Sequence, residues 1–326
     1  MAQEGRGDLR FVFYNVENLF DTFDDSLSLD DEFLPWGNRN WTWGKFLEKE
    51  HRIYKTLASI GLWEPPELVG LCEIENRFVL NWLTRKTPLM KYNYHIIHQD
   101  SPDERGIDVA LLYLSSRFRP LNWNCVPVGG LRSLTRDVLY VRGLVLERDT
   151  IHILICHWPS RWEGYLESLP QRLEAARTVR GILDSLWSVH DSPAILIAGD
   201  LNDELSDLSL SSVLRVQFPG TELVDTVLYL TGNQMQFRKK QEGFQGTCKY
   251  RGRWYEFDHI FVNGSFLSDS SLFVKPGGKR IFAPDFLLEE DPGMPGIRPF
   301  RTHDGFKYHG GFSDHLPVYI DIWRGD

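Results

Sequence analysis

Short apolar runs alternate along the chain with turns rich in polar residues, Gly and Pro, a pattern that predicts many β-strands. The runs cover residues 9–20, 67–75, 94–99, 107–114, 138–147, 151–158, 194–200, 255–263 and 316–323. Between them, apolar residues three and four positions apart predict amphipathic helices at 45–61, 76–86 and 171–189, the last with Pro170 directly before it. Many strands with a few helices between them favour two packed β-sheets with helices outside, an α/β sandwich.

Two long segments interrupt this rhythm. Residues 21–44 are acidic and rich in Trp, and residues 275–312 combine Pro, Gly and charges. Loops of this length in a compact domain are usually functional or disordered, and the aromatic content favours ordered loops packed at the mouth of a site. No internal repeat or boundary is visible in the pattern, so we expect residues 1–326 to form a single domain.

The charge balance restricts the function classes. Lys and Arg number 36 against 45 acidic residues, which gives a net charge of -9. This disfavours a passive, broadly basic nucleic-acid binder, because phosphate backbones are bound mainly by clustered Lys and Arg. It leaves open an enzyme that acts on phosphates through a bound cation, since the cation supplies the positive charge locally. The best local basic stretches are residues 237–240 and 249–253, although a solvated loop is the simpler interpretation of each.

The chain has no run of about 18 apolar residues, so we expect no transmembrane segment. The N-terminal residues lack the apolar core of a signal peptide, although a mature end left by cleavage would look the same. The cysteines form no close pair, and Cys72 and Cys156 lie in apolar runs typical of buried free thiols. We therefore expect a reducing compartment, with the cytoplasm favoured over export, and leave the oligomeric state open.

Short polar side chains recur where the predicted strands end. They are Asn15, Glu17, Glu73, Glu75, His157, Asp200 and Asn202, joined by Asp258 and His259 within a later strand and by Ser313, Asp314 and His315 before the last one. A turn, a solvated charge or a satisfied core histidine explains each of them alone. Their repetition at strand ends favours a shared site.

These side chains divide by the chemistry they suit. Mg²⁺ prefers carboxylate and amide oxygens, which Glu73, Asp314 and Asn15 offer. Structural zinc is disfavoured, because no Cys and His set has the required spacing. Hydrolysis of a phosphate ester also needs an oriented water, which Asp200 can position or deprotonate.

Donors to the phosphate oxygens are needed as well. Asn202 can hold an oxygen without repelling it, and His157 and His315 can bind non-bridging oxygens as charge develops. A histidine used in this way usually requires a carboxylate on its other nitrogen, for which Asp258 and Asp108 are available.

In order and in content, the motifs of this chain resemble those of the endonuclease/exonuclease/phosphatase superfamily, the deoxyribonuclease-I-like fold of metal-dependent phosphoesterases. The matching stretches are FYNVENLF (13–20), GLCEIEN (70–76), RGIDVALLY (105–113), CHWPSR (156–161), GDLND (199–203), RWYEFDHIFV (253–262) and GFSDHLPV (311–318). One departure is Cys72, which stands where many relatives have Gln before the metal glutamate. The tyrosine that abasic-site endonucleases place near the phosphate has no clear counterpart.

The resemblance implies a four-layer αββα sandwich in which two mixed β-sheets pack face to face. It places Asn15, Glu73 and Asp314 at one Mg²⁺, with Mn²⁺ as a substitute. The roles it implies for the other site residues are as follows: Asp200 positions the nucleophile, Asn202 lies beside the phosphate, Asp108 pairs with His157, Asp258 pairs with His315, and His315 contacts the scissile phosphate.

Four further side chains receive separate expectations. Asp203 and Glu75 are expected to be turn or solvent residues, whereas Arg136 and Asp137 either touch a phosphate or pair with one another.

The expected function is a metal-dependent nuclease acting on DNA or RNA. The alternative is a phosphatase or phosphodiesterase for a lipid head group, sphingomyelin, an inositol phosphate or a nucleotide, because one catalytic set serves all of these substrates. A non-catalytic binding module on the same scaffold is disfavoured, since the metal glutamate, the GDLN stretch and the SDH triplet are all retained.

Overall fold

Two β-sheets form the centre of the protein in the computed structural model, which describes residues 6–61, 64–130, 134–220, 223–231, 246–267, 271–275 and 277–325. The first sheet has the order β13-β19-β1-β2-β4-β3, with β14 also paired to β19. Its strands are β1 (Leu9–Leu19), β2 (Leu68–Ile74), β3 (His95–His98), β4 (Asp108–Tyr113), β13 (Leu272–Val274), β14 (Arg280–Ile281) and β19 (Val318–Arg324).

The second sheet has the order β5-β6-β7-β8-β12-β9. Its strands are β5 (Phe118–Val126), β6 (Val138–Val145), β7 (Asp149–His157), β8 (Ala194–Asp200), β9 (Leu228–Leu230) and β12 (Asp258–Asn263). Both sheets are mixed, since β1 runs parallel to β2 and β7 runs parallel to β8 while the other neighbours are antiparallel.

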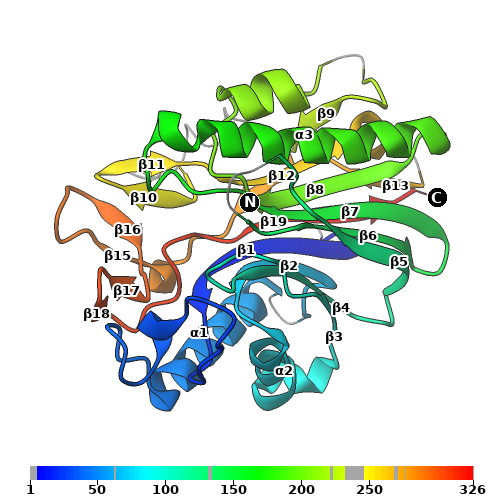
Figure 1. Ribbon diagram of the computed structural model, residues 1–326. Coiled ribbons are helices and arrows are strands. Elements are labelled where there is room, and N and C mark those ends of the chain that lie inside the picture. Colours follow the sequence, from blue (N-terminus) through cyan, green and yellow to red (C-terminus); the bar gives the residue numbers. More distant parts are fainter. Residues whose placement is uncertain are drawn as a thin grey trace.

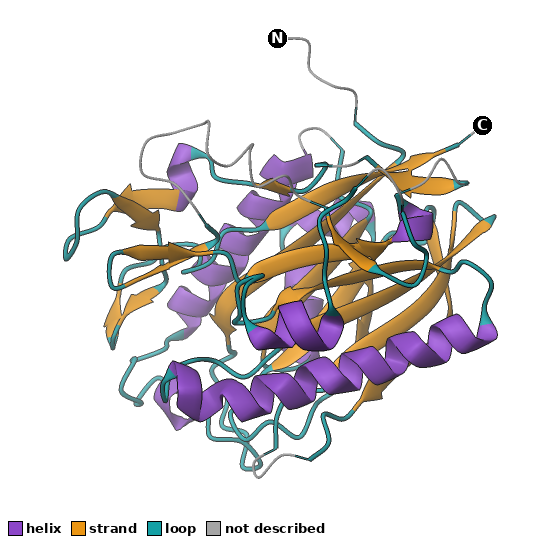
Figure 2. Cartoon of the chain, turned by 90° about the horizontal axis from the view of Figure 1, so that it is seen from above, coloured by secondary structure: helices purple, strands orange, loops and turns teal. Residues whose placement is uncertain are grey.

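Three α-helices in the described part of the chain cover the outer faces of the two sheets. Helices α1 (Trp43–Gly61) and α2 (Arg77–Lys86) pack on the first sheet, and α3 (Tyr165–Val189) lies across the second, as Figures 1 and 2 show from two directions. The predicted four-layer αββα sandwich is confirmed.

The alternation of side chains along β1 explains the layering. Phe11 and Phe13 point into the core between the sheets, whereas Val12 and Tyr14 pack with the helices outside. The two sheets pack tightly at Gly70, where an added Cβ would lie 2.8 Å from Cδ1 of Ile155. All of these positions are buried, so the strand ends rest on a rigid platform.

The predicted helix 171–189 is longer than expected and contains Pro170 instead of starting after it. Proline removes one helical hydrogen bond, and side-chain hydrogen bonds to backbone carbonyls support the first turns of the helix. Ser168 donates its hydroxyl to the carbonyl of Gly164, and Arg172 donates to the carbonyl of Tyr165. Helices α1 and α2 start within two residues of their predicted positions.

Strand β5 was missed by the sequence patterns. It is an edge strand whose side chains are mostly exposed or half-buried, and Pro120 lies beside a register shift in its pairing with β6. An exposed edge strand needs no alternation of polar and apolar residues, so its sequence carries no period-two signal.

Both long segments are ordered where the structure describes them. Residues 21–44 contain a 3-10 turn at Asp31–Phe33, and the second segment contains β14 and two hairpins. The hairpins are β15 (Leu288–Glu290) with β16 (Ile297–Pro299) and β17 (His303–Asp304) with β18 (Lys307–Tyr308). A further hairpin joins β10 (Cys248–Tyr250) to β11 (Arg253–Tyr255).

The four cysteines are free. None of the helices in the described part of the chain combines the length and the apolar character that crossing a bilayer requires.

Candidate active site

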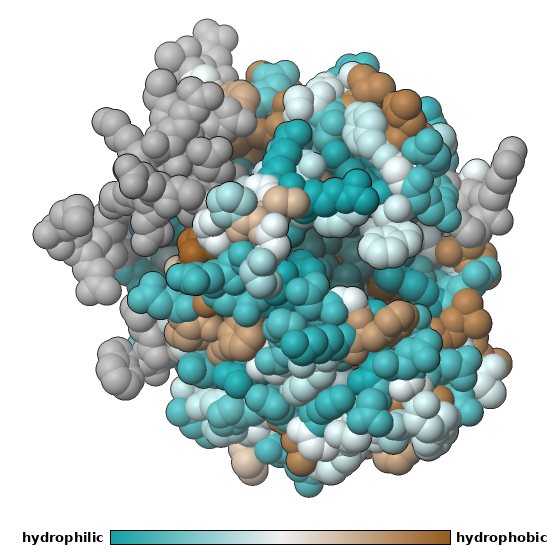
Figure 3. Space-filling model, turned by 90° about the vertical axis from the view of Figure 1, so that its left-hand side faces the viewer, coloured by the Kyte–Doolittle hydropathy of each residue, from teal (hydrophilic) through white to brown (hydrophobic). Residues whose placement is uncertain are grey.

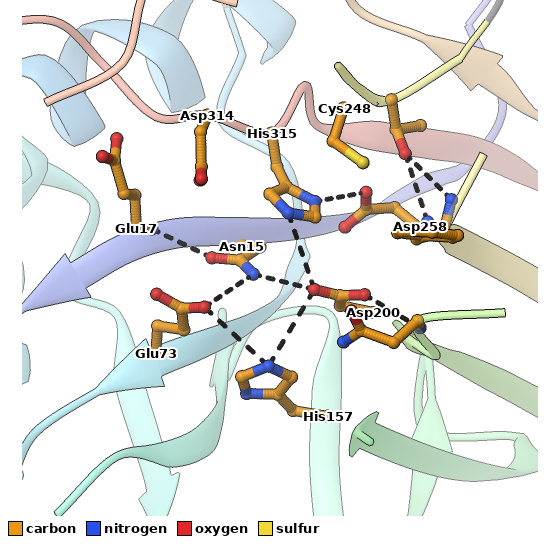
Figure 4. A network of polar contacts seen from close by, with 12 residues as sticks. Asn15, Glu17, Glu73, His157, Asp200, Cys248, Asp258, Asp314 and His315 are labelled. Carbon is orange, nitrogen blue, oxygen red and sulfur yellow. Dashed lines mark hydrogen bonds and ion pairs between the residues drawn. The ribbon is translucent and has the colours of Figure 1, made fainter. Parts of the chain in front are cut away.

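The ends of the central strands of both sheets meet at one edge of the sandwich. In the first sheet Asn15 lies opposite Cys72, and Glu73 follows in a bulge with a positive φ of 62°. In the second sheet Asp200 is flanked by His157 on the parallel strand and by Asp258 on the antiparallel one. Figure 4 shows these side chains converging, and Figure 3 shows a hollow with mainly hydrophilic surroundings on this face of the molecule.

Asn15 joins the two sheets at the centre of the cluster. Its Nδ2 donates to Oε1 of Glu73 at 3.1 Å and to Oδ2 of Asp200 at 3.0 Å. Its Oδ1 accepts from the backbone N–H of Glu17 at 2.9 Å, which fixes the orientation of the amide. The second oxygen of Glu73 accepts from the backbone N–H of Asn18 at 2.8 Å. Two carboxylates from different sheets are thus held together by one amide.

His315 is placed by Asp258 and faces Asp200. Its Nδ1 lies 2.7 Å from Oδ2 of Asp258, and its Nε2 lies 3.7 Å from Oδ2 of Asp200. Burial opposes protonation, but the two carboxylates outweigh it and hold the pKa of His315 well above its usual value. His315 therefore carries a positive charge near neutral pH, with Nε2 directed into the cluster.

His157 has the opposite electrostatic character. Its Nε2 lies 3.8 Å from Glu73 and 3.9 Å from Asp200. Burial, followed by Arg136 and Arg105, holds the pKa of His157 well below the usual value. This side chain is consequently neutral and directs Nε2 towards the centre.

Asp108 does not pair with His157. Its carboxylate lies 3.2 Å from Nε2 of His98 and accepts from the backbone N–H of Ser101 at 2.8 Å. The Nδ1 atom of His157 is buried and has no hydrogen-bond partner among the described residues. The expected pairing is wrong because Asp108 stands at the start of β4, where β3 presents His98 from the other side.

Asp200 and Asn202 lie at the end of β8. Burial raises the pKa of Asp200 to about 7. The charge of His315 opposes this shift, whereas the charge of Asp258 adds to it. Its Oδ1 accepts from the backbone N–H of Asn202, which has a positive φ of 50°. The side-chain amide of Asn202 donates to the carbonyl of Trp158 at 3.1 Å, which places Asn202 between β8 and the loop after His157.

Asp314 completes the set from the last loop. Figure 4 shows its carboxylate directed towards Asn15 and Glu73, so the predicted ligands from three separate stretches face one another. Ser313 fixes this turn, because its hydroxyl donates to the carbonyl of Asn15 at 2.7 Å and accepts from the backbone N–H of His315. The side chain of Asp314 is 35% exposed and lies 3.9 Å from Arg301.

Glu17 and the buried Lys49 support the loop that carries Asp314. Glu17 accepts from the backbone N–H groups of Thr302 and His303 at 2.6 and 3.1 Å. Lys49 of α1 donates to the hydroxyl of Thr302 and, at 2.8 Å, to the carbonyl of Phe312. The sequence signal for Lys49 is its position on the apolar face of the predicted helix 45–61, four residues before Ile53.

Asp203 is not a turn or solvent residue. It is fully buried, with Oδ1 at 2.7 Å from both Arg161 and Arg172, and Oδ2 accepts from the hydroxyl of Ser209 at 2.5 Å. This ion pair fastens the end of β8 to α3. Sequence alone could not reveal it, since both arginines are distant in the chain.

Arg136 and Asp137 do not pair with one another. Arg136 is buried and joins Asp103, at 2.9 Å, to the carbonyl of Trp158, at 2.8 Å. Glu75 is buried as well, and its carboxylate accepts from the backbone N–H of Asp21. Burial, together with the charge of Asp21, raises the pKa of Glu75 to about 9. These side chains stabilise the loops around the cluster.

The donor set fits a hard divalent cation. Asp200, Asp258 and His315 have ligand atoms that all lie within 4.8 Å of one another, and a second group of this kind is His98, Asp100 and Asp108. In the first group Nδ1 of His315 is already engaged by Asp258, and neither group includes the expected ligands Glu73 and Asp314. Glu73 and Asp258 both raise the pKa of Asp200, so the carboxylates repel one another in a buried site. A divalent cation would relieve this repulsion.

Comparison with known proteins agrees with the fold and the motifs. The model of the Endonuclease/Exonuclease/phosphatase family matches residues 10–324. The chain therefore belongs to this family of phosphoesterases. No curated protein sequence was found to match it.

Solved structures with the same fold share little sequence with this chain. An endonuclease/exonuclease/phosphatase from Bacteroides vulgatus is 15% identical, with a TM-score of 0.59, and the match covers 97% of this chain and 98% of the other. D. rerio TDP2 complexed with a single-strand DNA product is 15% identical, with a TM-score of 0.56, and the match covers 96% of this chain and 98% of the other. A mannosyl-6-phosphatase from Bacteroides thetaiotaomicron is 14% identical, with a TM-score of 0.57, and the match covers 97% of this chain and 99% of the other.

Proposed function

We propose that this protein is a divalent-metal-dependent phosphoesterase that hydrolyses phosphodiester bonds of DNA or RNA by in-line attack of water. The observation that carries the proposal is the position of Asp200, which lies 3.9 Å from the neutral His157 and 3.7 Å from the charged His315. A carboxylate between two such groups can orient a water molecule while the histidines hold the phosphate.

The roles of the side chains follow from their environments. Asp200 accepts a hydrogen bond from the attacking water and thereby directs a lone pair of the water oxygen at phosphorus. His315, charged and oriented by Asp258, binds a non-bridging oxygen, and His157 donates its N–H to another without adding charge. Asn202 lies beside Asp200 and supplies a neutral donor.

The metal ligands we propose are Glu73 and Asp314, with Asn15 beside them. When bound there, Mg²⁺, or Mn²⁺ in its place, supplies positive charge against the phosphate oxygens and eases departure of the leaving group. Asn15 holds the carboxylates of Glu73 and Asp200 in a fixed relation, so their geometry does not depend on the substrate.

A phosphatase acting on a small phosphate ester is the second candidate. The similarity to a mannosyl-6-phosphatase is as strong as that to D. rerio TDP2, so the fold does not favour either substrate class. In the predicted basic stretch 249–253, Lys249 pairs with Asp291 and Arg253 pairs with Glu204, which leaves these cations little free charge for nucleic acid. The other stretch, 237–240, lies outside the described residues.

A panel of substrates tests the proposal. Plasmid DNA and RNA are compared with sphingomyelin, inositol phosphates, nucleotides and a sugar phosphate, each with Mg²⁺, with Mn²⁺ and with EDTA. We expect nucleic acid to be cleaved only with metal and the Asp200→Ala variant to be inactive. Cleavage of phosphomonoesters alone would favour the second candidate, and hydrolysis in EDTA would contradict the metal dependence.

A further inference from the structure

Two arginines, Arg105 and Arg301, lie beside the carboxylate cluster. The backbone of each is held by hydrogen bonds of its loop, but each guanidinium group makes only long contacts with a carboxylate. Arg105 precedes β4, in which Asp108 pairs with Ile74, the residue after Glu73. Its backbone N–H donates to Oδ1 of Asp103 at 3.0 Å. The next residue, Gly106, has a φ of +64°, and an added Cβ would lie 2.7 Å from Cβ of Ser28. The loop that presents Arg105 is therefore held in one shape.

The guanidinium group of Arg105 is poorly neutralised. Its side chain is 53% exposed, and its nearest carboxylate oxygen, on Asp103, lies 3.8 Å away. The other oxygen of Asp103 is taken by Arg136 at 2.9 Å, so one carboxylate serves two arginines. Arg105 consequently keeps a charge available on the side of the cluster occupied by Glu73 and His157.

Arg301 lies beside Asp314, the predicted metal ligand from the last loop. Its terminal nitrogen lies 3.9 Å from Asp314, and its Nε is buried without a hydrogen-bond partner among the described residues. The backbone after Arg301 is anchored, because Thr302 and His303 donate to Glu17. Like Arg105, this arginine joins a fixed backbone to donors that the fold leaves unused.

An exposed aromatic side chain follows a residue that is bonded to the end of β8. Trp162 is 87% exposed, although the residue before it is firmly anchored. Arg161 donates to the carbonyl of Asn202 at 2.6 Å and to Asp203 at 2.7 Å, which ties this loop to the end of β8. An exposed indole on an anchored loop beside a phosphate site is a suitable surface for an unpaired base.

We propose that Arg105 and Arg301 bind the phosphates on either side of the scissile one and that Trp162 stacks on a base, so that the site selects a single nucleic-acid strand. This inference rests on the proposed function. A flanking phosphate must pass close to Glu73 or Asp314, whose negative charge would repel it. Arginine offsets that repulsion and binds phosphate through two parallel hydrogen bonds. An isolated phosphate ester uses neither arginine in this way.

The kinetic test compares a thymidine octanucleotide with bis(4-nitrophenyl) phosphate as substrates, both with Mg²⁺. The variants are Arg105→Gln and Arg301→Gln. The control is Arg119→Gln, since Arg119 is 52% exposed but lies on the edge strand β5, where it pairs with Glu147. We expect the ratio of kcat/KM for the octanucleotide to that for the small ester to fall about tenfold in each of the first two variants, and to stay unchanged in the control. An unchanged ratio, or an equal loss on both substrates, would overturn the proposal.

A binding test is independent of turnover. Fluorescence anisotropy with a labelled octanucleotide, without added metal, should show the Kd rising about tenfold for Arg105→Gln and for Arg301→Gln. Trp162→Ala should weaken binding of the octanucleotide about tenfold but not that of an abasic octamer of equal charge, and Trp162→Phe should restore it. Equal weakening with both octamers would overturn the stacking role. If the wild type hydrolyses neither substrate, the proposed function fails, and an unchanged Kd would then reject the arginine roles separately.

Discussion

The side-chain nitrogen of Asn15 lies 3.0 Å from the carboxylate of Asp200, although 185 residues separate the two in the chain. The same nitrogen donates to Glu73, so one neutral amide connects carboxylates from both sheets. A charged residue in this place would either repel or neutralise them. The amide instead orients both groups while leaving their charge available for a cation.

Two replacements of Asn15 should therefore distinguish its effect on the position of the Glu73 and Asp200 carboxylates from the effect of charge at this place. We expect Asn15→Ala to lower kcat/KM by about 10²-fold, because the two carboxylates lose their common donor. Asn15→Asp keeps the shape but adds a negative charge, and we expect at least the same loss together with a higher requirement for Mg²⁺. Metal titration of the activity checks this, and equal metal requirements in both variants would contradict the role of the amide.

Removing Asp200 or His315 should abolish catalysis without unfolding the protein. We expect Asp200→Ala and His315→Ala to lower turnover by about 10²-fold or more, since each removes a group that acts on the reacting atoms. Circular dichroism and thermal unfolding serve as controls for the fold. Near-normal hydrolysis by either variant would reject its assignment.

The buried ion pairs of Asp203 should contribute to stability. Asp203→Ala leaves Arg172 buried without its carboxylate, and we expect the free energy of unfolding to fall by about 3–5 kcal/mol. Asp184 offers a matched control, because it pairs with Arg180 at 2.7 Å on the exposed face of the same helix. Its replacement by alanine should cost about 0.5 kcal/mol or less in urea unfolding. Similar losses in both variants would contradict the importance of burial.

Lys49 should act on activity through the loop that carries Asp314. In Lys49→Met the carbonyl of Phe312 loses a buried donor and Glu17 loses a cation, so we expect lower stability and a lower kcat with little change in KM. The exposed Lys86, replaced in the same way, serves as the control. A change confined to KM would place Lys49 in substrate binding instead.

Buried histidines should make the protein less stable in acid. Burial, and then the neighbouring His190, lowers the pKa of His152 to about 4. The unfolded chain takes up this proton below about pH 6.5 and the folded chain only near 4, so the free energy of unfolding falls as the pH falls through that window. The contribution is on the order of 3 kcal/mol.

The matching measurement is urea unfolding between pH 7 and pH 4. Between pH 7 and pH 4 the free energy of unfolding should fall by on the order of 3 kcal/mol less in His152→Gln than in the wild type, because the histidine that takes up the proton on unfolding is gone. His152 lies away from the candidate active site, against Tyr140, so activity at neutral pH serves as the control. An unchanged pH dependence would show that the proton uptake belongs to other groups, such as His259, whose pKa is also lowered to about 4 by burial.

The limits of the sequence are clearest in three side chains. Asp108 is acidic and well placed along its strand, yet its partner is His98, because pairing between β3 and β4 decides which histidine it meets. Asp203 reads as a turn residue next to the GDLN stretch, whereas α3 brings Arg172 to bury it. Lys49 lies on the apolar face of its helix, but its partners are known only once the loop at Thr302 folds against α1.

The sequence by itself determined the alternation of buried faces along β1, the helices α1 and α2, the layered architecture and the polar residues that end the central strands. These features are local, because side-chain periodicity and strand ends follow from neighbouring residues. Only the tertiary structure decided which of those polar groups face one another, as when Asn15 reaches Asp200 and Ser313 reaches the carbonyl of Asn15. Such contacts join distant parts of the chain, and their geometry is fixed by how closely the two sheets pack.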